Sequence, residues 1–215
     1  QDSKFRAIRA VKNRFGAVNE LGVFLMSDKG LKEVNNPSAI FLQRVADNTP
    51  GSVITVTWEG SRPMLVEVQA LVDESNAGAP RRVTVGVDQN RVIMGLAILN
   101  RHGAVPIYDQ DVFINVVSGV KITETAADLA LICAVVSSLR NKAIPSDVVI
   151  FGELGLGGEL RPVQNAQSRL SEAVKHGFKK AIIPKANLPK GKFAGLEIII
   201  ADKLSDVLQS IRNLD

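Results

Sequence analysis

The sequence has 215 residues, of which 46% are hydrophobic and only 5% aromatic, and its formal net charge is +4. This length allows one or two packed domains whose core is mostly Val, Ile, Leu and Ala, as in buried strands packed against helices. The single cysteine excludes an internal disulfide, and one cysteine with two histidines provides too few ligands for a zinc site. The sequence also lacks the ~20 consecutive apolar residues of a membrane span. A cytoplasmic protein with no membrane partner is therefore expected.

The first part of the chain is expected to form a small domain. Residues 18–26 have the composition of a strand, and residues 36–42 are expected to form a short helical turn. Turn-forming residues follow at 47–52, between two strand-like segments, and they predict a domain boundary. The predicted domains are therefore residues 1–50 and residues 51–215.

Two further strands are expected directly after this boundary. Residues 52–58 and 65–72 alternate apolar and polar side chains, as half-buried strands do. Residues 59–63 between them are typical of a hairpin turn. The polar segment 73–82 is expected to be a loop.

The rest of the chain alternates expected helices and strands, which indicates an α/β (α+β) fold with mixed sheets and packed helices. Residues 88–101 have apolar residues at helical spacing, with Asp88 as the N-cap and Gly103 as the stop. The other expected elements are strands at 111–117, 148–151, 181–183 and 197–200, and helices at 166–176 and 204–211.

A long apolar helix is expected over residues 123–139. Thr125 and Asp128 have the spacing of a capping box at its start. Cys133 lies among apolar neighbours in this helix, so it is expected to be a small buried thiol.

The glycine-rich and lysine-rich segments contain no complete nucleotide-binding pattern. Residues 190–193, Lys-Gly-Lys-Phe, lack the hydroxyl residue and the glycine spacing of a Walker phosphate-binding loop. Residues 152–158 fail the dinucleotide-binding pattern, because Leu160 occupies the place of its third glycine. We interpret this segment as a tight turn between strands.

A short motif near the start of the chain resembles the signature of a known family. Lys12, Asn13, Arg14, Phe15 and Gly16 form the KNRFG string of the RadA (Sms) family of bacterial DNA-repair proteins. In that family the motif lies near the end of a RecA-like ATPase domain, so the resemblance implies that the first predicted domain is the remnant of one. Its cations suit a phosphate backbone, or a γ-phosphate across a subunit interface. The resemblance continues in residues 19–24, 30–34 and 36–38.

The second predicted domain resembles the proteolytic domain of the Lon family, most clearly in residues 146–153, 160–163 and 176–184. Active members of that family use a Ser–Lys dyad. Against this pattern the serine position falls on Ala126 and the lysine position on Gln167, which implies a Lon-protease-like fold with a degenerate, inactive site. A shifted register would bring in Thr125, Ser168 or Arg169, but an arginine stays protonated and cannot be the general base.

Together, the resemblances imply a DNA-binding and oligomerisation module of a longer, hexameric, DNA-dependent ATPase that promotes branch migration in recombination. The longer protein is then expected to use ATP and Mg²⁺, to bind single-stranded or branched DNA, and to work with recombination proteins such as RecA. Within these residues no cofactor, no metal and no enzymatic activity are expected, because the Walker loop and the dyad are missing. Two alternatives remain open: a ring-forming scaffold without DNA contacts, and an active peptidase with a shifted site.

Basic residues gather near the N-terminus and in the stretch 173–196, which contains no acidic residue. No aromatic residues are interleaved with them as a base-stacking surface would require, so contacts to the DNA backbone are expected. Such binding is weakly sequence-specific and sensitive to salt. The candidate DNA contacts are Lys12, Arg14, Arg81, Arg82, Lys175, Lys179 and Lys180.

Overall fold

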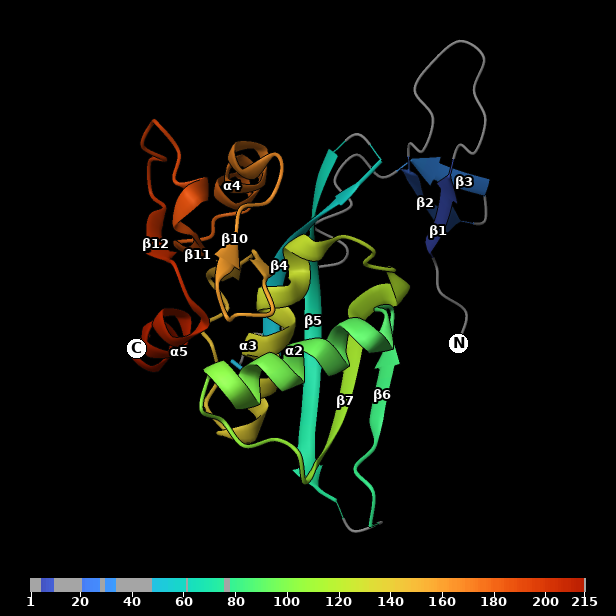
Figure 1. The fold of residues 1–215 in the computed structure, drawn as a ribbon. Helices are drawn as coiled ribbons and strands as arrows, with labels where there is room; N and C mark the ends of the chain where they lie inside the picture. The colour runs from blue at the N-terminus through green and yellow to red at the C-terminus, as the bar shows by residue number, and fades with distance from the viewer. Residues whose placement is uncertain are drawn as a thin grey trace.

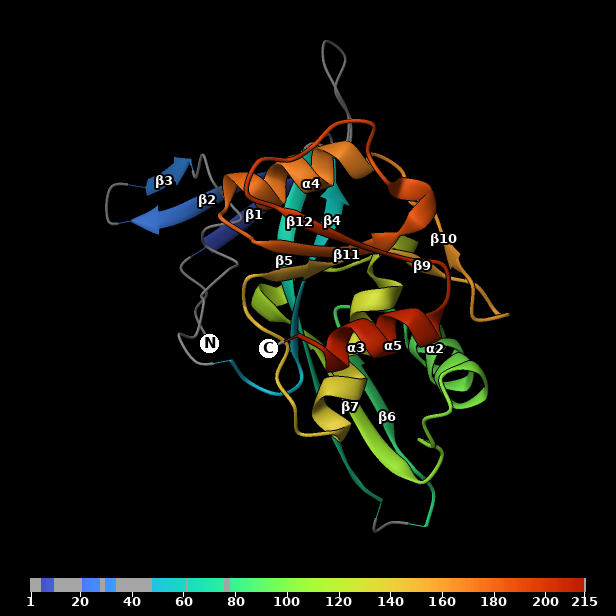
Figure 2. The same ribbon diagram turned by 90° about the vertical axis from the view of Figure 1, so that its left-hand side faces the viewer.

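The computed structural model describes residues 5–9, 21–27, 30–33, 48–60, 62–75 and 78–214. Strands and helices alternate through most of this length, and helices lie on both faces of a mixed sheet (Figure 1, Figure 2). The α/β fold class is therefore confirmed. None of the described helices combines the length and the apolar composition that a bilayer span requires.

The first part of the chain contains a three-stranded antiparallel sheet in the order β1-β2-β3. Its strands are β1 (Phe5–Arg9), β2 (Leu21–Ser27) and β3 (Gly30–Glu33). Strand β2 corresponds to the described part of the strand expected at 18–26, whereas the sequence pattern does not predict β1 and β3. The helical turn expected at 36–42 lies outside the described residues, and the domain boundary near residue 50 stays a prediction.

A seven-stranded mixed sheet, in the order β12-β11-β8-β4-β5-β7-β6, organises the rest of the chain. Neighbours from β12 to β4 are parallel, β4, β5 and β7 are antiparallel, and β6 is parallel to β7. The strands are β4 (Ser52–Glu59), β5 (Arg62–Glu74), β6 (Arg82–Val85), β7 (Gln110–Val116), β8 (Val148–Ile150), β11 (Lys180–Pro184) and β12 (Glu197–Ala201). A separate hairpin of β9 (Glu153–Leu154) and β10 (Leu160–Arg161) confirms that the glycine-rich segment is a turn between strands.

The strand predictions hold from the β12 edge of this sheet to β7 and fail at the β6 edge. Strands β4 and β5 pair along the whole length of β4, which confirms the predicted hairpin. The loop expected at 73–82 is wrong at both ends, because β5 extends to Glu74 and β6 begins at Arg82. Asp73 and Glu74 are polar, but β5 pairs with β7 at both positions, so tertiary pairing overrides their weak strand preference.

Helices lie on both faces of the seven-stranded sheet. In Figure 2, α4 lies on one side of strands β11 and β12, and α2, α3 and α5 lie on the other. The helices are α2 (Gln89–His102), α3 (Asp128–Leu139), α4 (Ala166–Lys175) and α5 (Leu204–Arg212), with 3₁₀ turns η1 (Val117–Gly119), η2 (Thr125–Ala127) and η3 (Lys185–Asn187).

Two hydrophobic cores result, one on each face of the sheet. Successive strand residues point to opposite faces, so in β5 Val66 enters the core beneath α2 and α3, whereas Leu65 enters the core beneath α4. Helix α2 packs closely on α3 at Gly95, where a Cβ atom would lie 2.7 Å from the Cδ1 atom of Ile132. The missing side chain thus sets how closely these two helices approach.

Helix α2 begins and ends where the sequence predicts. The side chain of Asp88 accepts a hydrogen bond from the N–H of Arg91 at 3.0 Å, which confirms it as the N-cap. At the other end Gly103 donates its N–H to the carbonyl of Leu99 at 2.9 Å and ends the helix.

The capping box predicted at Thr125 and Asp128 is wrong. Thr125 belongs to the 3₁₀ turn η2, and α3 begins only at Asp128, after an N-cap residue, Ala127, without a capping side chain. The carboxylate of Asp128 instead accepts hydrogen bonds from the guanidinium of Arg91 on α2. A partner from another helix therefore replaces the local partner that the spacing suggests.

Helix α3 buries the single thiol of the chain, and burial raises the pKa of Cys133 to about 12. At mildly alkaline pH this leaves about a thousandfold less thiolate than a thiol of ordinary pKa would have. We expect Cys133 to be inert to Ellman's reagent in the native protein and to react fully in guanidinium chloride. Rapid native reaction would instead show that α3 opens readily.

Candidate functional site

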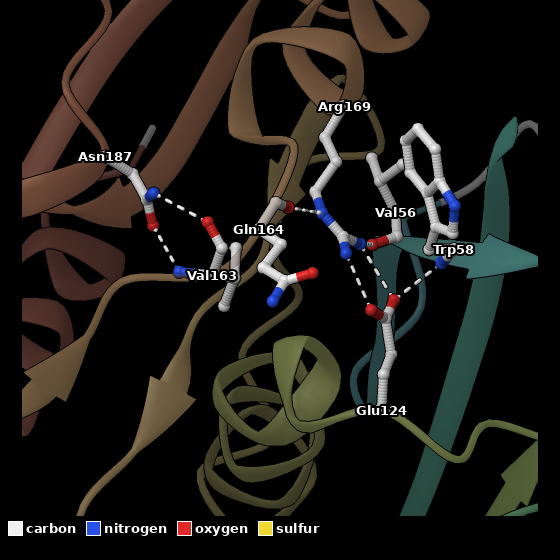
Figure 3. Close-up of polar contacts among 7 residues, drawn as sticks. All are labelled: Val56, Trp58, Glu124, Val163, Gln164, Arg169 and Asn187. Carbon is white, nitrogen blue, oxygen red and sulfur yellow. Dashed lines mark hydrogen bonds and ion pairs between the residues drawn. The ribbon is translucent and has the colours of Figure 1, made fainter. Parts of the chain in front are cut away.

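An ion pair between a buried arginine and a glutamate that is 25% exposed joins the segment before the 3₁₀ turn η2 to helix α4 (Figure 3). The side chain of Arg169 is 1% exposed. Its guanidinium donates two parallel hydrogen bonds to the carboxylate of Glu124, from Nη1 to Oε1 at 2.8 Å and from Nη2 to Oε2 at 2.6 Å. A planar guanidinium matches a carboxylate in this fork geometry, so the pair also fixes orientation.

The other hydrogen-bonding groups of this pair are engaged as well. The Nε atom of Arg169 donates to the carbonyl of Gln164 at 3.0 Å, and Nη1 donates to the carbonyl of Val56 at 2.5 Å. The N–H of Trp58 donates to Oε1 of Glu124 at 2.6 Å. Buried charges are tolerated when their partners are satisfied in this way, so one arginine connects α4, β4 and the segment before η2.

The local sequence explains why Arg169 is buried. It lies four residues before the buried Ala173, so the two share one side of α4. The segment before α4 is held by Asn187, whose amide exchanges hydrogen bonds with the backbone of Val163 at 2.8 and 2.9 Å (Figure 3). The helical spacing of Arg169 from Ala173 could have identified it as a residue on the buried side of the helix. No comparable pattern in the sequence marks Glu124 as its partner.

The two predicted dyad positions carry neither a nucleophile nor an amine. Ala126 lies in η2 and is 1% exposed, and its carbonyl accepts the N–H of Gly152 at 2.7 Å. Gln167 is exposed in the first turn of α4. Since Glu124 and Arg169 each lie two residues from one of these positions, their ion pair ties together the two segments that carry them.

The residues of a shifted dyad are placed differently. Thr125 is half-buried and Ser168 is exposed. The guanidinium of Arg169 is already bound by the carboxylate of Glu124. A shifted peptidase site would therefore need a general base from elsewhere.

A cavity of about 340 Å³ lies beside Thr125, between α2, α3 and the β9–β10 hairpin. Its lining combines apolar side chains, such as Met94 and Leu154, with the ion pair between Arg91 and Asp128. Small-molecule sites commonly have this size and mixture. Sequence reasoning missed the cavity because Arg91 and Asp128 are far apart in the chain. No described residues form a cluster of three or more His, Cys, Asp or Glu that could hold a metal ion.

Burial raises the pKa of the Asp128 carboxyl above its ordinary value. Hydrogen bonds and charge from Arg91 oppose this shift, as does the N–H of Leu154, which lies 3.5 Å from Oδ2 of Asp128. Desolvation is the larger effect, so the folded protein favours the neutral acid more than the unfolded chain does.

Three of the predicted DNA contacts gather where α4 leads into β11. Lys175 is in the last turn of α4, with Nζ 3.8 Å from Oε2 of Glu172, and its side chain is 64% exposed. Lys179 is exposed and Lys180 is half-buried at the start of β11. Phe178 between them is buried, and its N–H donates to a carbonyl of α4. The α4–β11 turn (residues 175–180) thus presents its lysines from an anchored backbone.

The other described candidates, Arg81 and Arg82, are engaged within the fold. Arg81 donates to the carboxylate of Asp111 from Nε at 2.8 Å and Nη2 at 2.5 Å, and its hydrogen bonds lower the pKa of Asp111. Arg82 donates to the carbonyls of Gln110 and Ile107. Both arginines therefore hold β6 and β7 together, and their role in DNA binding stays a prediction.

The KNRFG motif, residues 12–16, lies outside the described residues. Its proposed contacts to phosphate, and those of Lys12 and Arg14 to DNA, stay predictions. Of the seven candidate DNA contacts, the described part of the chain contains two groups, the three lysines of the α4–β11 turn and the consecutive Arg81 and Arg82.

Comparison with known proteins gives relatives similar along nearly the whole chain, and three of them are each described as DNA repair protein RadA. The relative from Pseudomonas aeruginosa is 64% identical over 210 residues, which are 98% of this chain and 46% of that protein. The relative from Escherichia coli K12 is 59% identical over 213 residues, 99% and 46% of the two chains. The relative from Bacillus subtilis 168 is 45% identical over 208 residues, 96% and 45%. The chain thus spans less than half the length of these curated relatives.

A family model described as subunit ChlI of Mg-chelatase matches residues 76–187, just over half of the chain. This match contradicts the prediction that the chain has no enzymatic role, because the model describes a subunit of an enzyme. The relatives are also more than twice as long as their matched segments. The absence of a Walker loop and of the Ser–Lys dyad from this chain is therefore no evidence against an enzymatic role.

The buried pair makes a prediction for stability. Arg169→Met leaves the Glu124 carboxylate, whose side chain is 25% exposed, without its counter-charge, so we expect the free energy of unfolding to fall by about 3 kcal/mol, the lower end of the range for buried pairs. Urea unfolding followed by circular dichroism measures the change. Arg161→Met, which removes an exposed arginine paired with Glu159, is the matched control and should leave the midpoint close to wild type. Equal effects of the two variants would contradict a special role for the buried pair.

The raised pKa of Asp128 makes a prediction for pH dependence. Folding raises this pKa, so the carboxyl contributes most to stability while it is protonated, and the contribution is lost as pH rises through the folded value. In Asp128→Asn this titration is absent. The stability of wild type relative to the variant should therefore fall in urea titrations as pH rises above the ordinary carboxyl pKa of about 4. A difference that grows with pH would show that the ion pair with Arg91 outweighs burial.

Proposed function

Because the chain belongs to the RadA family of DNA-repair proteins and carries the ChlI domain of Mg-chelatase at residues 76–187, we propose that it is the DNA-binding and oligomerisation module of a RadA-type recombination protein. The observation that carries this proposal is the 64% identity to a DNA repair protein over 98% of the chain. Similarity at this level, without large gaps in coverage, supports a shared role in DNA repair.

The α4–β11 turn is the proposed DNA contact. Lys175, Lys179 and Lys180 lie within six residues, and the stretch 173–196 around them contains no acidic residue. Lysine ammonium groups bind phosphate as point charges, without reading base edges. The C-terminal end of a helix also favours nearby cations such as Lys175. This surface therefore suits a phosphate backbone, single-stranded or branched.

The domain after residue 50 is proposed to have a Lon-protease-like fold with a degenerate dyad. Ala126 and Gln167 take the serine and lysine positions, and the ion pair of Glu124 with Arg169 spans the gap between their segments. In this arrangement the ion pair joins the two segments that would carry the serine and the lysine in an active member of the family. The domain then serves DNA binding and assembly through its surfaces.

The longer protein is proposed to be a cytoplasmic, hexameric, DNA-dependent ATPase that promotes branch migration together with recombination proteins such as RecA. ATP and Mg²⁺ would be its cofactors. The residues of this chain do not fit an ATP phosphate site by themselves, because no Walker pattern occurs in the sequence. The KNRFG motif would contribute Lys12 and Arg14 to phosphate contacts, on DNA or on a nucleotide in a neighbouring subunit.

DNA binding is tested by fluorescence anisotropy with short single-stranded, double-stranded and branched DNA at low and moderate salt. We expect salt-sensitive binding that weakens when Lys175, Lys179 and Lys180 are all replaced by Ala. Each lost phosphate contact should reduce the slope of log affinity against log salt by about 0.7–0.9, so the triple variant should lose about 2–3 units.

The matched control removes three exposed cations elsewhere, by Lys32→Ala, Lys121→Ala and Arg161→Ala. The control variant has the same net charge as the first variant. It therefore separates a local contact of the α4–β11 turn with DNA from the general attraction between a basic protein and DNA. Equal losses in the two variants would reject the α4–β11 turn as the contact. Absence of wild-type binding even at low salt, with assembly intact, would instead support a ring-forming scaffold whose DNA contacts lie outside this chain.

A further inference from the structure

Among the helices that the structure describes, those that cover the β5, β7 and β6 half of the sheet lie on one face of it. Helix α4 packs against β4 and β5, where Ile54 and Leu65 join its core. Toward β7 and β6 that face carries apolar side chains in register, since Leu71 of β5 lies opposite Phe113 of β7, and Phe113 opposite Val83 of β6. Leu71 is 59% exposed, Val83 45% and Val85 55%. We call Leu71, Val83, Val85 and Phe113 the strand patch.

A second apolar surface lies on the other side of the same strands. Helix α2, in front of β5, β7 and β6 in Figure 1, exposes Ile93 (45%) and Met94 (48%). Leu156, at the tip of the β9–β10 turn, is 71% exposed and lines the same cavity as Met94. We call Ile93, Met94 and Leu156 the helix patch. Soluble monomers rarely expose several neighbouring large apolar side chains, and here two such groups occur on opposite faces.

The charges beside the two patches are opposite. Asp73 follows Leu71 on the same face of β5 and is exposed. The neighbouring acid Asp111 is paired with Arg81, whose guanidinium lies 5.4 Å from the centroid of the Phe113 ring in the strand patch. On α2, Arg101 lies seven residues after Met94, on the same side of the helix, and is exposed. One exposed acid, Asp73, therefore lies beside the strand patch and one exposed base, Arg101, beside the helix patch, where Glu153 also lines the cavity.

The shapes of the two patches also differ. The strand patch borders a groove of about 520 Å³, lined by the start of β4 together with β5, β6 and β7. The helix patch instead presents Leu156 at the tip of a tight glycine-rich turn, where it is the most exposed of the three. A projecting leucine and an apolar groove are complementary, but within one molecule they lie on opposite faces and cannot meet.

We propose that the helix patch of one copy of this chain docks on the strand patch of the next, with Leu156 over the groove and Arg101 facing Asp73. A contact between two different surfaces is heterologous, so each copy keeps one free surface of each kind and further copies can add. This closes into a ring when the rotation between copies allows it. The inference rests on the proposed oligomerisation function and assigns the surfaces that would carry it.

The test uses the whole chain, with light scattering and sedimentation velocity over a range of concentrations. Val83→Glu inactivates the strand patch and Met94→Glu the helix patch, each at an exposed position where the fold should tolerate the change. We expect each variant alone to assemble at least about tenfold more weakly than wild type. Mixed in equal amounts, they should form a dimer and stop, because only one intact surface of each kind remains. Circular dichroism confirms that both variants fold.

Charge reversal gives a second, independent readout. Asp73→Arg or Arg101→Asp alone should weaken assembly, and the double variant should restore it, which a purely structural effect of either change would not do. Three results overturn the proposal: assembly like wild type by both patch variants, a dimer formed by Met94→Glu alone, or no restoration in the double variant. A wild-type chain that stays monomeric overturns both this inference and the proposed oligomerisation, whereas anisotropy tests DNA binding separately.

Discussion

The guanidinium of Arg169 sits out of solvent between α4, β4 and the segment before η2, and the packing of this region depends on it. Removing a guanidinium and a carboxylate from water is costly, and the pair with Glu124 offsets that cost only because four hydrogen bonds satisfy the arginine. The geometry is therefore specific: a shift of α4 or of η2 would break several bonds together. The positions of Ala126 and Gln167 relative to one another follow from this constraint.

The arrangement of helices around the sheet decides which surfaces remain for partners. Helices α2, α3 and α5 cover one face, whereas α4 covers the other from β11 across β8 and β4 to β5, so β7 and β6 keep an exposed apolar face. The α4–β11 turn places its lysines on a part of the molecule built by different elements from those that form the strand patch. Variants of the two surfaces therefore test the proposed DNA binding and the proposed assembly separately.

Much of the fold could be predicted because the relevant signals are local. Asp88 and Gly103 mark the ends of α2 through contacts within one helical turn, and Cys133 is buried because its own helix is apolar throughout. The errors occur where a distant partner decides. Asp128 has the spacing of a cap but binds Arg91 of another helix, and the end of β5 is polar but pairs with β7. In each case tertiary contacts outweigh a weak local preference.

The sequence by itself determined the family, through the KNRFG motif, and the order of most helices and strands, because both depend on residues close together in the chain. It also marked the lysines of the α4–β11 turn as a group. Only the tertiary structure decided that Arg169 pairs with Glu124, that Arg81 is bound by Asp111, and that apolar surfaces remain open on opposite faces. These outcomes depend on which segments meet after folding, and neither spacing nor composition carries that information.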